Sequence, residues 1–160
     1  MEIFKRIEKG LTKQGYTFER TDYNRPWGGF IVINEDHKQQ FINQFLEGKL
    51  TTKVDVGMKL SPKILIVAPD QRLSWQYHHR RSEIWQIIEG SVGIITSLTD
   101  IENKMAIYNS GDRIEIPMGE RHRLIGLDNY GIVAEIWVHE DPSNPSDEDD
   151  IVRIQDDFGR

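Results

Sequence analysis

Cysteine is absent from this chain of 160 residues, which excludes a disulfide framework and any metal site built from thiolates. No apolar run approaches the roughly 20 residues that a membrane-spanning helix needs. The first residues, Met1 to Ile7, lack the apolar core and the cleavage site of a secretory leader. These absences predict a soluble, cytoplasmic protein, and the chain is long enough for one domain with a hydrophobic core.

Positive charge is scarce near the C-terminus. From Glu140 onward there are eight acidic residues and two arginines, so this tail carries the whole net charge of −6. The preceding 139 residues hold 18 basic and 18 acidic side chains and show no basic stripe. We therefore expect no nucleic-acid partner, and we interpret the acidic tail as a solvated face.

The first part of the chain contains helical patterns and one strand. Residues 1–15 place their apolar side chains on one helical face. A turn at residues 25–29 leads into an apolar strand at residues 30–33. A second short helix, capped by Asn34, is expected within residues 34–48.

From Lys63 onward the pattern changes to short strands separated by turn signals. The predicted strands are Lys63–Ala68, Leu73–His78, Glu83–Glu89, Val92–Ser97, Met105–Tyr108, Asp112–Ile116, Arg121–Gly126 and Ile132–His139. About eight or nine strands at this spacing are typical of an all-β jelly roll made of two sheets. We predict a barrel over residues 25–160, with a helical insertion at residues 34–48, an acidic C-terminal tail and a preceding helical arm over residues 1–24.

Two short blocks of sequence contain side chains that ligate metals. The first has Gln76, His78 and Glu83, and the second has a Pro117-x-Gly119 turn followed by His122. Residues two apart share one face of a strand, so Gln76 and His78 should point the same way. Glu83 on a neighbouring strand and His122 after the turn can converge on the same ion. Nitrogen and oxygen ligands of this kind suit zinc, iron, manganese, cobalt or nickel.

The spacing of both blocks, with glycines at Gly90 and Gly111, is the two-part signature of the cupin barrel. A glutamine stands where many cupins have a first histidine. His79 should point out of the barrel, and we interpret it, with His37 and His139, as structural or solvated.

Beyond these blocks, the chain resembles the cupin-type isomerase domain of type II phosphomannose isomerases, in a free-standing, single-domain form. The shared segments are Arg25-Pro26-Trp27-Gly28, Leu73 to Arg80, Ile116 to Leu124, Glu148 to Arg153 and Asp156 to Arg160. The likeness extends over roughly residues 25–160, apart from an insertion at residues 34–60.

The resemblance implies a metal-dependent isomerase of a sugar phosphate such as mannose 6-phosphate, with one metal ion held by Gln76, His78, Glu83 and His122. Zinc is the implied metal, with manganese, iron and nickel as alternatives. Bifunctional members carry a nucleotidyltransferase domain ahead of the barrel; these residues contain none, so nucleotide-sugar synthesis is not expected. Many members have a Lys-Arg pair on the strand before the metal block, where this chain has Lys63-Ile64.

An aldose–ketose isomerase also needs a base within reach of the proton on C2. Glu135 is the predicted base, because a carboxylate within the apolar run 133–137 either points into the barrel or is badly placed. Lys63 is predicted to stabilise the developing oxyanion or to bind phosphate. The other predicted substrate ligands are Arg72, Arg81 and Arg123 for the phosphate, and Trp85 and Trp137 for a sugar face, unless these tryptophans only pack in the core.

Two other functions fit the same sequence. The barrel could be a non-catalytic module that binds a metal and a sugar, or another metal-cupin enzyme such as a dioxygenase or an epimerase. The glutamine at position 76 argues against a dioxygenase, because iron sites of that class normally have histidine there. The sugar stays open among mannose 6-phosphate, other aldose or heptose phosphates and free aldoses. We further expect a homodimer, formed through strand edges or residues 1–24, and no membrane partner.

Overall fold

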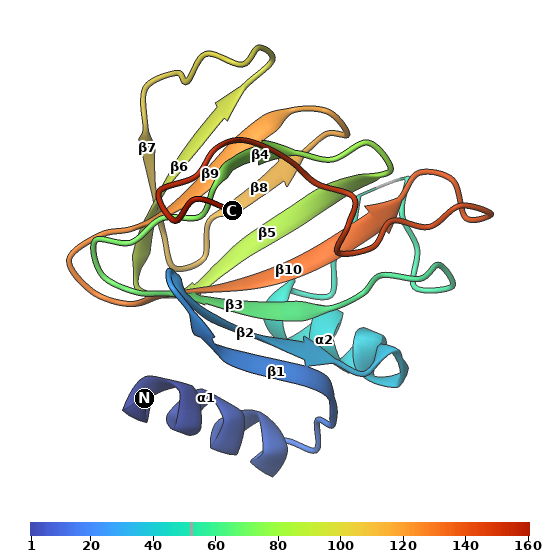
Figure 1. The fold of residues 1–160 in the computed structure, drawn as a ribbon. Helices are drawn as coiled ribbons and strands as arrows, with labels where there is room; N and C mark the ends of the chain where they lie inside the picture. The colour runs from blue at the N-terminus through green and yellow to red at the C-terminus, as the bar shows by residue number, and fades with distance from the viewer. Residues whose placement is uncertain (52) are drawn as a thin grey trace.

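The computed structural model describes residues 1–51 and 53–160, and two antiparallel sheets that face each other dominate it (Figure 1). The six-stranded sheet contains, in spatial order, β1 (Phe18–Arg25), β2 (Gly28–Ile33), β3 (Lys63–Val67), β10 (Gly131–His139), β5 (Arg81–Glu89) and β8 (Arg113–Ile116). The five-stranded sheet contains β11 (Val152–Gln155), β4 (Trp75–Tyr77), β9 (Arg121–Gly126), β6 (Ser91–Ser97) and β7 (Ala106–Asn109). The helices of the described residues are α1 (Glu2–Lys13), the short 3-10 helix η1 (Glu35–His37) and α2 (Lys38–Phe45). The predicted all-β jelly roll is confirmed.

Side chains from alternate strand positions fill the space between the two sheets. Leu65, Trp85 and Val133 from the six-stranded sheet belong to one buried cluster with Ile94 and Leu124 from the five-stranded sheet. Residues two positions away on the same strand share this face. The polar residues of β3, β5 and β10 that are described below therefore point into the barrel.

A second hydrophobic layer covers the outer face of the six-stranded sheet. Phe4 and Leu11 from α1 and Phe41 and Ile42 from α2 pack in one cluster with Ile64 and other outward-facing strand residues. Figure 1 shows both helices on the side of β1, β2 and β3 that faces away from the five-stranded sheet. Because both faces of the sheet are covered, every residue of β10 is buried, which explains its almost continuous apolar sequence.

Two strands, β1 and β11, are not predicted from the sequence. β1 has the polar sequence FERTDYNR, which hides any alternation, and it is held in the sheet by pairing with β2. The predicted helical arm over residues 1–24 is therefore wrong in its second half, since the helix ends at Lys13 and β1 begins at Phe18. Asn34 is the N-cap residue of η1, as predicted, but its side chain makes no capping hydrogen bond and instead donates to Thr17 Oγ1 at 2.6 Å.

The C-terminal segment, residues 140–160, crosses the open end of the barrel, and in Figure 1 it passes in front of β5 and ends beside β4. Within it β11 pairs with β4 and extends the five-stranded sheet. Asp150 is only 5% exposed. Its carboxylate accepts hydrogen bonds from the backbone N–H groups of His79 (2.9 Å) and Arg80 (3.0 Å) and from the Ser146 hydroxyl (2.6 Å). The interpretation of the tail as a solvated face is therefore wrong for Asp150.

Two turns need glycine for reasons of backbone geometry. Gly28 has a φ of +142°, and a Cβ there would lie 2.0 Å from the carbonyl oxygen of Ile66, so the Arg-Pro-Trp-Gly turn packs directly on β3. Gly119 has a φ of +82°, and its N–H donates to the His78 carbonyl at 3.0 Å. The turn before β9 is thus tied to the residue that follows β4.

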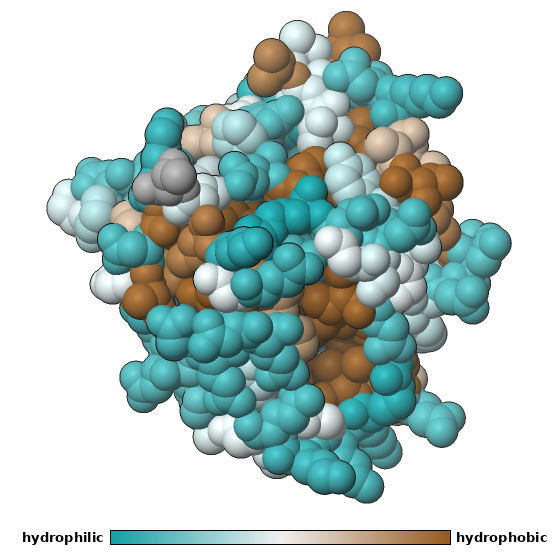
Figure 2. All heavy atoms as spheres, turned by 180° about the vertical axis from the view of Figure 1, so that it is seen from behind, coloured by the Kyte–Doolittle hydropathy of each residue, from teal (hydrophilic) through white to brown (hydrophobic). Residues whose placement is uncertain are grey.

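The molecular surface carries a few large apolar side chains. Figure 2 shows hydrophobic residues at the tip of the molecule, where the loop between β6 and β7 lies in Figure 1. Leu98 and Ile101 in that loop are 82% and 77% exposed. Within the described part of the chain, no helix has the length and apolar character to cross a membrane. The cytoplasmic location stays a prediction.

Replacing Asp150 with alanine should destabilise the protein by about 3 kcal/mol, because two part-buried backbone N–H groups and the Ser146 hydroxyl lose a charged acceptor. Chemical unfolding at pH 7 measures this loss. Asp149→Ala is the matched control, since that neighbouring residue is exposed, and it should change stability by less than about 0.5 kcal/mol. Equal unfolding free energies of the two variants would contradict the role given to Asp150.

Candidate metal centre

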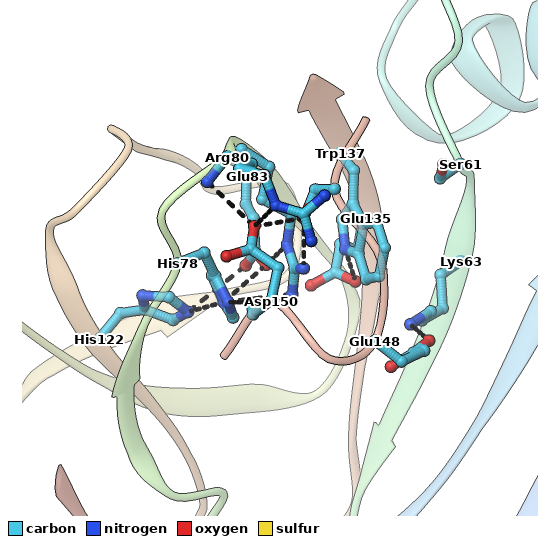
Figure 3. A network of polar contacts seen from close by, with 12 residues as sticks. Ser61, Lys63, His78, Arg80, Glu83, His122, Glu135, Trp137, Glu148 and Asp150 are labelled. Atoms are coloured by element: carbon cyan, nitrogen blue, oxygen red, sulfur yellow. Dashed lines mark hydrogen bonds and ion pairs between the residues drawn. The ribbon is translucent and has the colours of Figure 1, made fainter. Parts of the chain in front are cut away.

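Three side chains with metal-ligating atoms converge inside the barrel (Figure 3). His78 follows β4, Glu83 lies on β5 and His122 lies on β9, and the residues are 2%, 2% and 1% exposed. The Nε2 atoms of the two histidines are 3.2 Å apart. Glu83 Oε1 lies 3.2 Å from His78 Nε2, and Glu83 Oε2 lies 3.5 Å from His122 Nε2. One ligand atom from each residue falls within 4.8 Å of the others, which is close enough for a shared ion.

Backbone carbonyls orient both imidazole rings. His78 Nδ1 donates to the carbonyl of Asp150 at 2.7 Å, and His122 Nδ1 donates to that of Glu120 at 3.0 Å. With the proton on Nδ1, the neutral ring presents the lone pair of Nε2 to the cluster. A hydrogen bond from the second ring nitrogen is what usually fixes a metal-ligating histidine.

The protonation states of the cluster suit a cation. Burial lowers the pKa of His122 to about 4, so its ring is neutral at pH 7. Burial alone would raise the pKa of Glu83, but its electrostatic interactions with His78, Arg81 and His122 outweigh burial and hold that pKa well below its ordinary value. A neutral imidazole beside an ionised carboxylate is the state in which these groups bind a divalent metal.

One oxygen of the cluster lacks a partner. Glu83 Oε2 is buried and accepts no hydrogen bond from residues 1–51 and 53–160. A buried carboxylate oxygen without a donor is costly, and a cation between the ligands would satisfy it. The donor set of two imidazoles and a carboxylate therefore fits a divalent metal ion.

Gln76 borders this cluster from β4. It lies directly opposite His122 in the β4–β9 pair, so both side chains share one face of the sheet. Its Oε1 accepts a hydrogen bond from Ser74 Oγ at 2.5 Å, and the residue lines the same cavity as Glu83. Sheet pairing thus turns the glutamine to the same face as His122, and its role as a fourth ligand stays a prediction.

Arg81 is a buried cation beside the cluster. Its Nε donates to Glu83 Oε1 at 2.9 Å, and its Nη2 lies 3.2 Å from His78 Nε2. Its Nη1 donates to Ser146 Oγ at 2.9 Å, and its guanidinium lies 3.6 Å from the centre of the Trp137 ring. The arginine therefore connects Glu83 to the C-terminal segment and holds its carboxylate in one orientation.

Glu135 points into the barrel from β10. The strand register places it beside Lys63 on β3 and Trp85 on β5. Its two carboxylate oxygens accept the indole N–H groups of Trp85 and Trp137, each at 2.8 Å. Burial, together with the negative charge of Glu83, raises the pKa of Glu135 to about 7. A carboxyl group with this pKa can take up and release a proton near neutral pH.

Lys63 lies on the side of Glu135 away from the metal ligands. It is 6% exposed, and its Nζ donates to Glu148 Oε1 at 3.0 Å. The same ammonium lies 4.4 Å from the ring centre of Trp137 and 5.0 Å from that of Phe30. Figure 3 shows Glu135 and Trp137 between the metal cluster and the Lys63–Glu148 pair.

A cavity of about 100 Å³ connects these groups. Seven of the site residues predicted from the sequence line this cavity: Lys63, Gln76, Arg81, Glu83, Trp85, Glu135 and Trp137. Further lining residues, which the sequence prediction omits, are Arg25, Trp27, Glu148, Arg153 and Arg160. Each of these five residues lies in a segment that carries the resemblance to phosphomannose isomerases, and that is the signal that could have found it; Phe30 and Leu65 also line the cavity and lie outside those segments.

Two predicted phosphate ligands lie elsewhere. Arg72 forms a bidentate ion pair with Asp157, with distances of 2.7 and 2.9 Å. Arg123 is 1% exposed and donates to Glu102 at 2.7 Å and to the carbonyl of Leu73 at 2.9 Å. Among the described residues, neither arginine lines the cavity. The assignment of Arg72 and Arg123 to the substrate is corrected, because protein acceptors already hold both guanidinium groups.

Ile64 also lies outside the cavity. It follows Lys63 on β3 and therefore faces the other side of the sheet, where it is fully buried in the helical layer. An arginine at this position would enter that layer. The departure from the family's Lys-Arg pair thus leaves the cations of the cavity unchanged.

Comparison with known sequences agrees with this geometry. Residues 47–156 match the family model described as mannose-6-phosphate isomerase C-terminal. The chain belongs to this family. The matched region includes the His78, Glu83 and His122 cluster, Glu135 and Lys63, whereas the cavity residues Arg25, Trp27 and Arg160 lie outside it.

Curated relatives are much longer proteins. Mannose-1-phosphate guanylyltransferase ManC of Salmonella typhimurium is 30% identical over 107 residues, which are 67% of this chain and 21% of the relative. Alginate biosynthesis protein AlgA of Pseudomonas aeruginosa is 27% identical over 158 residues, which are 98% of this chain and 27% of the relative. The chain thus spans about a quarter of the length of these relatives.

Two solved structures show the same fold at low sequence identity. The capsular polysaccharide assembling protein CapF of Staphylococcus aureus has a TM-score of 0.54 and 15% identity, covering 84% of this chain and 33% of its own. Vicilin of Solanum lycopersicum has a TM-score of 0.55 and 19% identity, covering 81% of this chain and 33% of its own. At these identities the likeness concerns the barrel architecture alone.

Removing His122 should abolish stabilisation of the protein by metal. Wild-type protein should unfold at a higher temperature with one equivalent of zinc than with a chelator, because the ligands converge only in the folded state. His122→Ala should lose at least about nine-tenths of that shift. His79→Ala is the matched control, since His79 is exposed beside a proposed ligand, and it should keep the full shift. Equal zinc effects in the His122 variant and wild type would refute the site.

Glu135 should make the stability of the metal-free protein depend on pH. Its pKa rises from 4.5 to about 7 on folding, so the folded state binds the proton more tightly. The stabilisation is full below about pH 4.5 and is lost as the pH rises through 7. The unfolding free energy of Glu135→Gln minus that of wild type should therefore rise by about 3 kcal/mol as the pH increases from 4.5 to 8. Urea unfolding in chelator measures the difference, and a pH-independent difference would show that the pKa is not raised.

Proposed function

We propose that this protein is a metal-dependent aldose–ketose isomerase that acts on a sugar phosphate of the mannose 6-phosphate type. The observation that carries the proposal is the position of Glu135, a buried carboxyl group with a pKa of about 7, beside the cluster of His78, Glu83 and His122. Such an isomerase needs a base for the proton on C2 and an electrophile for the oxygens on C1 and C2. The barrel interior offers candidates for both.

Glu135 is the proposed proton carrier. Its carboxylate removes the proton from C2 of the open-chain aldose, and its carboxylic acid returns a proton to C1, so the side chain is regenerated in each cycle. The hydroxyl proton passes from the oxygen on C2 to the oxygen on C1, which leaves a carbonyl at C2 and a hydroxyl at C1. The indole N–H groups of Trp85 and Trp137 hold the two oxygens in place. Each oxygen keeps a second lone pair for the substrate. These tryptophans therefore act by positioning the base, in addition to any contact with the sugar.

The proposed metal ligands are Gln76, His78, Glu83 and His122. When bound, a divalent ion would act as a Lewis acid that polarises the carbonyl group and stabilises the negative charge developing on the neighbouring oxygens. The ligand types suit zinc, with manganese, iron and nickel as alternatives. Arg81 supports this site through its hydrogen bond to Glu83.

Lys63 is the proposed second electrophile. The strand register places it directly opposite Glu135, and it lines the same cavity. A hydrogen bond from Nζ to a developing oxyanion would strengthen as charge builds up in the transition state. Glu148, which holds the ammonium at 3.0 Å, keeps the lysine oriented when no substrate is bound.

The proposed substrate class comes from the family and its relatives. The family description names mannose 6-phosphate, and ManC is named for mannose 1-phosphate. A cavity that combines cations with three indole rings is suited to a phosphorylated sugar, which has a charged end and an apolar ring face. The homodimer predicted from the sequence stays a prediction.

Glu135→Gln should lower kcat for conversion of mannose 6-phosphate to fructose 6-phosphate by about 10²- to 10⁴-fold, because the amide cannot accept the C2 proton. The variant should still bind zinc, because the proposed ligands are unchanged, so its loss of activity would not be a loss of metal. Glu115→Gln is the matched control, since Glu115 lies exposed on β8, and its kcat should equal that of wild type. Loss of deuterium from C2 of labelled substrate into water follows the proton transfer directly.

The same assay separates the competing functions. A zinc-loaded wild-type protein that converts no sugar or sugar phosphate of a broad panel would contradict the isomerase and favour a non-catalytic module that binds a metal and a sugar. Turnover with an unchanged kcat in Glu135→Gln would keep the isomerase and refute Glu135 as its base.

A further inference from the structure

Three arginines that were not part of the predicted site line the cavity. Arg25 ends β1, Arg153 lies on β11 and Arg160 lies at the end of the C-terminal segment. They come from the two edge strands β1 and β11, one from each sheet, and from the segment that crosses the open end of the barrel. An ion pair between Arg20 on β1 and Glu148 in that segment, at 3.0 Å, holds these parts together.

Strand pairing directs Arg153 toward the cavity. It lies opposite Gln76 in the β11–β4 pair, so the two side chains share one face of the sheet. The neighbouring ion pairs use other arginines, namely Arg20 with Glu148, Arg25 with Asp22 and Arg160 with Asp156. Within residues 1–51 and 53–160, the Arg153 guanidinium has no ion pair or hydrogen bond of its own.

Arg25 is also incompletely satisfied. Its Nε lies 3.0 Å from Asp22 Oδ2. The geometry is not that of a hydrogen bond, however, and this buried nitrogen has no hydrogen-bond partner among the described residues. A buried guanidinium N–H without an acceptor is costly, so an anionic ligand at this point would satisfy a group that the protein leaves open.

Positive charge exceeds negative charge around these arginines. The cations are Arg20, Arg25, Lys63, Arg153 and Arg160, and the carboxylates that pair with them are Asp22, Glu148 and Asp156. The surplus of two positive charges matches the charge of a phosphate dianion. Burial and the positive charges of Arg160 and Arg25 lower the pKa of Arg153, as expected where like charges gather without enough counter-charge.

We infer that Arg25, Arg153 and Arg160 bind the phosphate group of the substrate, while the carbonyl end of the sugar lies between Glu135 and the metal ligands. This inference rests on the proposed isomerase function. Guanidinium groups bind phosphate oxygens in pairs through their planar N–H forks. In a hexose 6-phosphate the phosphate lies at the opposite end of the carbon chain from C1 and C2. The base and the arginines thus recognise different ends of one substrate.

Arg153→Ala tests this assignment by its effect on KM. For mannose 6-phosphate, KM should rise by at least about tenfold while kcat stays within about threefold, because the variant loses binding and keeps the base. Turnover of unphosphorylated mannose, measured at high concentration, should be the same in variant and wild type. Arg6→Ala is the matched control, since Arg6 is an exposed arginine of α1 paired with Glu89, and it should change neither constant.

A second measurement does not depend on activity. Titration of chelator-treated protein with inorganic phosphate, followed by calorimetry, reports binding at the arginines with no metal to attract the anion. Wild type and Arg6→Ala should bind one phosphate, and Arg153→Ala should bind it at least about tenfold more weakly. Arg153→Ala should remain folded, because the side chain makes no ion pair that its removal would break. Unfolding temperatures in phosphate-free buffer check this.

The outcomes separate this inference from the proposed function. Normal turnover with an unchanged KM and unchanged phosphate binding in Arg153→Ala would overturn the phosphate site and leave the isomerase intact. Phosphate binding that depends on Arg153, in a protein that isomerises no sugar phosphate, would support the anion site and refute the isomerase.

Discussion

The architecture of the site depends on the way Asp150 fastens the C-terminal segment to the turn after β4. Its carboxylate accepts the backbone N–H groups of His79 and Arg80, and its backbone carbonyl accepts the Nδ1 proton of His78. One residue therefore anchors the tail and orients a metal ligand at the same time. The docked tail in turn brings Glu148 to Lys63 and adds Arg153 to the cavity wall. The contacts that dock the tail therefore also orient a residue of the proposed metal cluster.

Burial of the six-stranded sheet on both faces sets the chemistry of its interior. The helical layer covers the outer face of β10, so that strand cannot turn polar residues outward. Glu135 must then lie among tryptophans inside the barrel, away from water, and its pKa rises as a consequence. Helices α1 and α2, on the outer face of the sheet, therefore influence the pKa of a carboxyl group on its inner face.

The sequence predicts the parts of this protein that local patterns encode. β3 and β10 show almost continuous apolar runs, and the proposed metal ligands lie at spacings that glycine and proline turns make recognisable. β1 cannot be predicted in this way, because its polar residues are held by pairing with β2. The arginines show the same limit: Arg72 lies near the metal block in sequence, yet Asp157 holds it outside the cavity, whereas Arg153 is hidden among acidic residues and reaches the cavity through the register of β11 with β4. Which acceptor an arginine meets is decided by tertiary packing.

Two buried carboxyl groups in one barrel acquire opposite properties from their surroundings. Glu83 is surrounded by His78, Arg81 and His122, so its pKa falls and it stays ionised as a ligand. Glu135 receives only neutral indole donors, so burial prevails and its pKa rises to about 7. The negative charge of Glu83 contributes to that rise, and a divalent ion at the cluster would counter it. Metal binding would therefore shift Glu135 toward the ionised form that a base requires, so that the ligand site and the proton carrier are electrostatically coupled before any substrate enters.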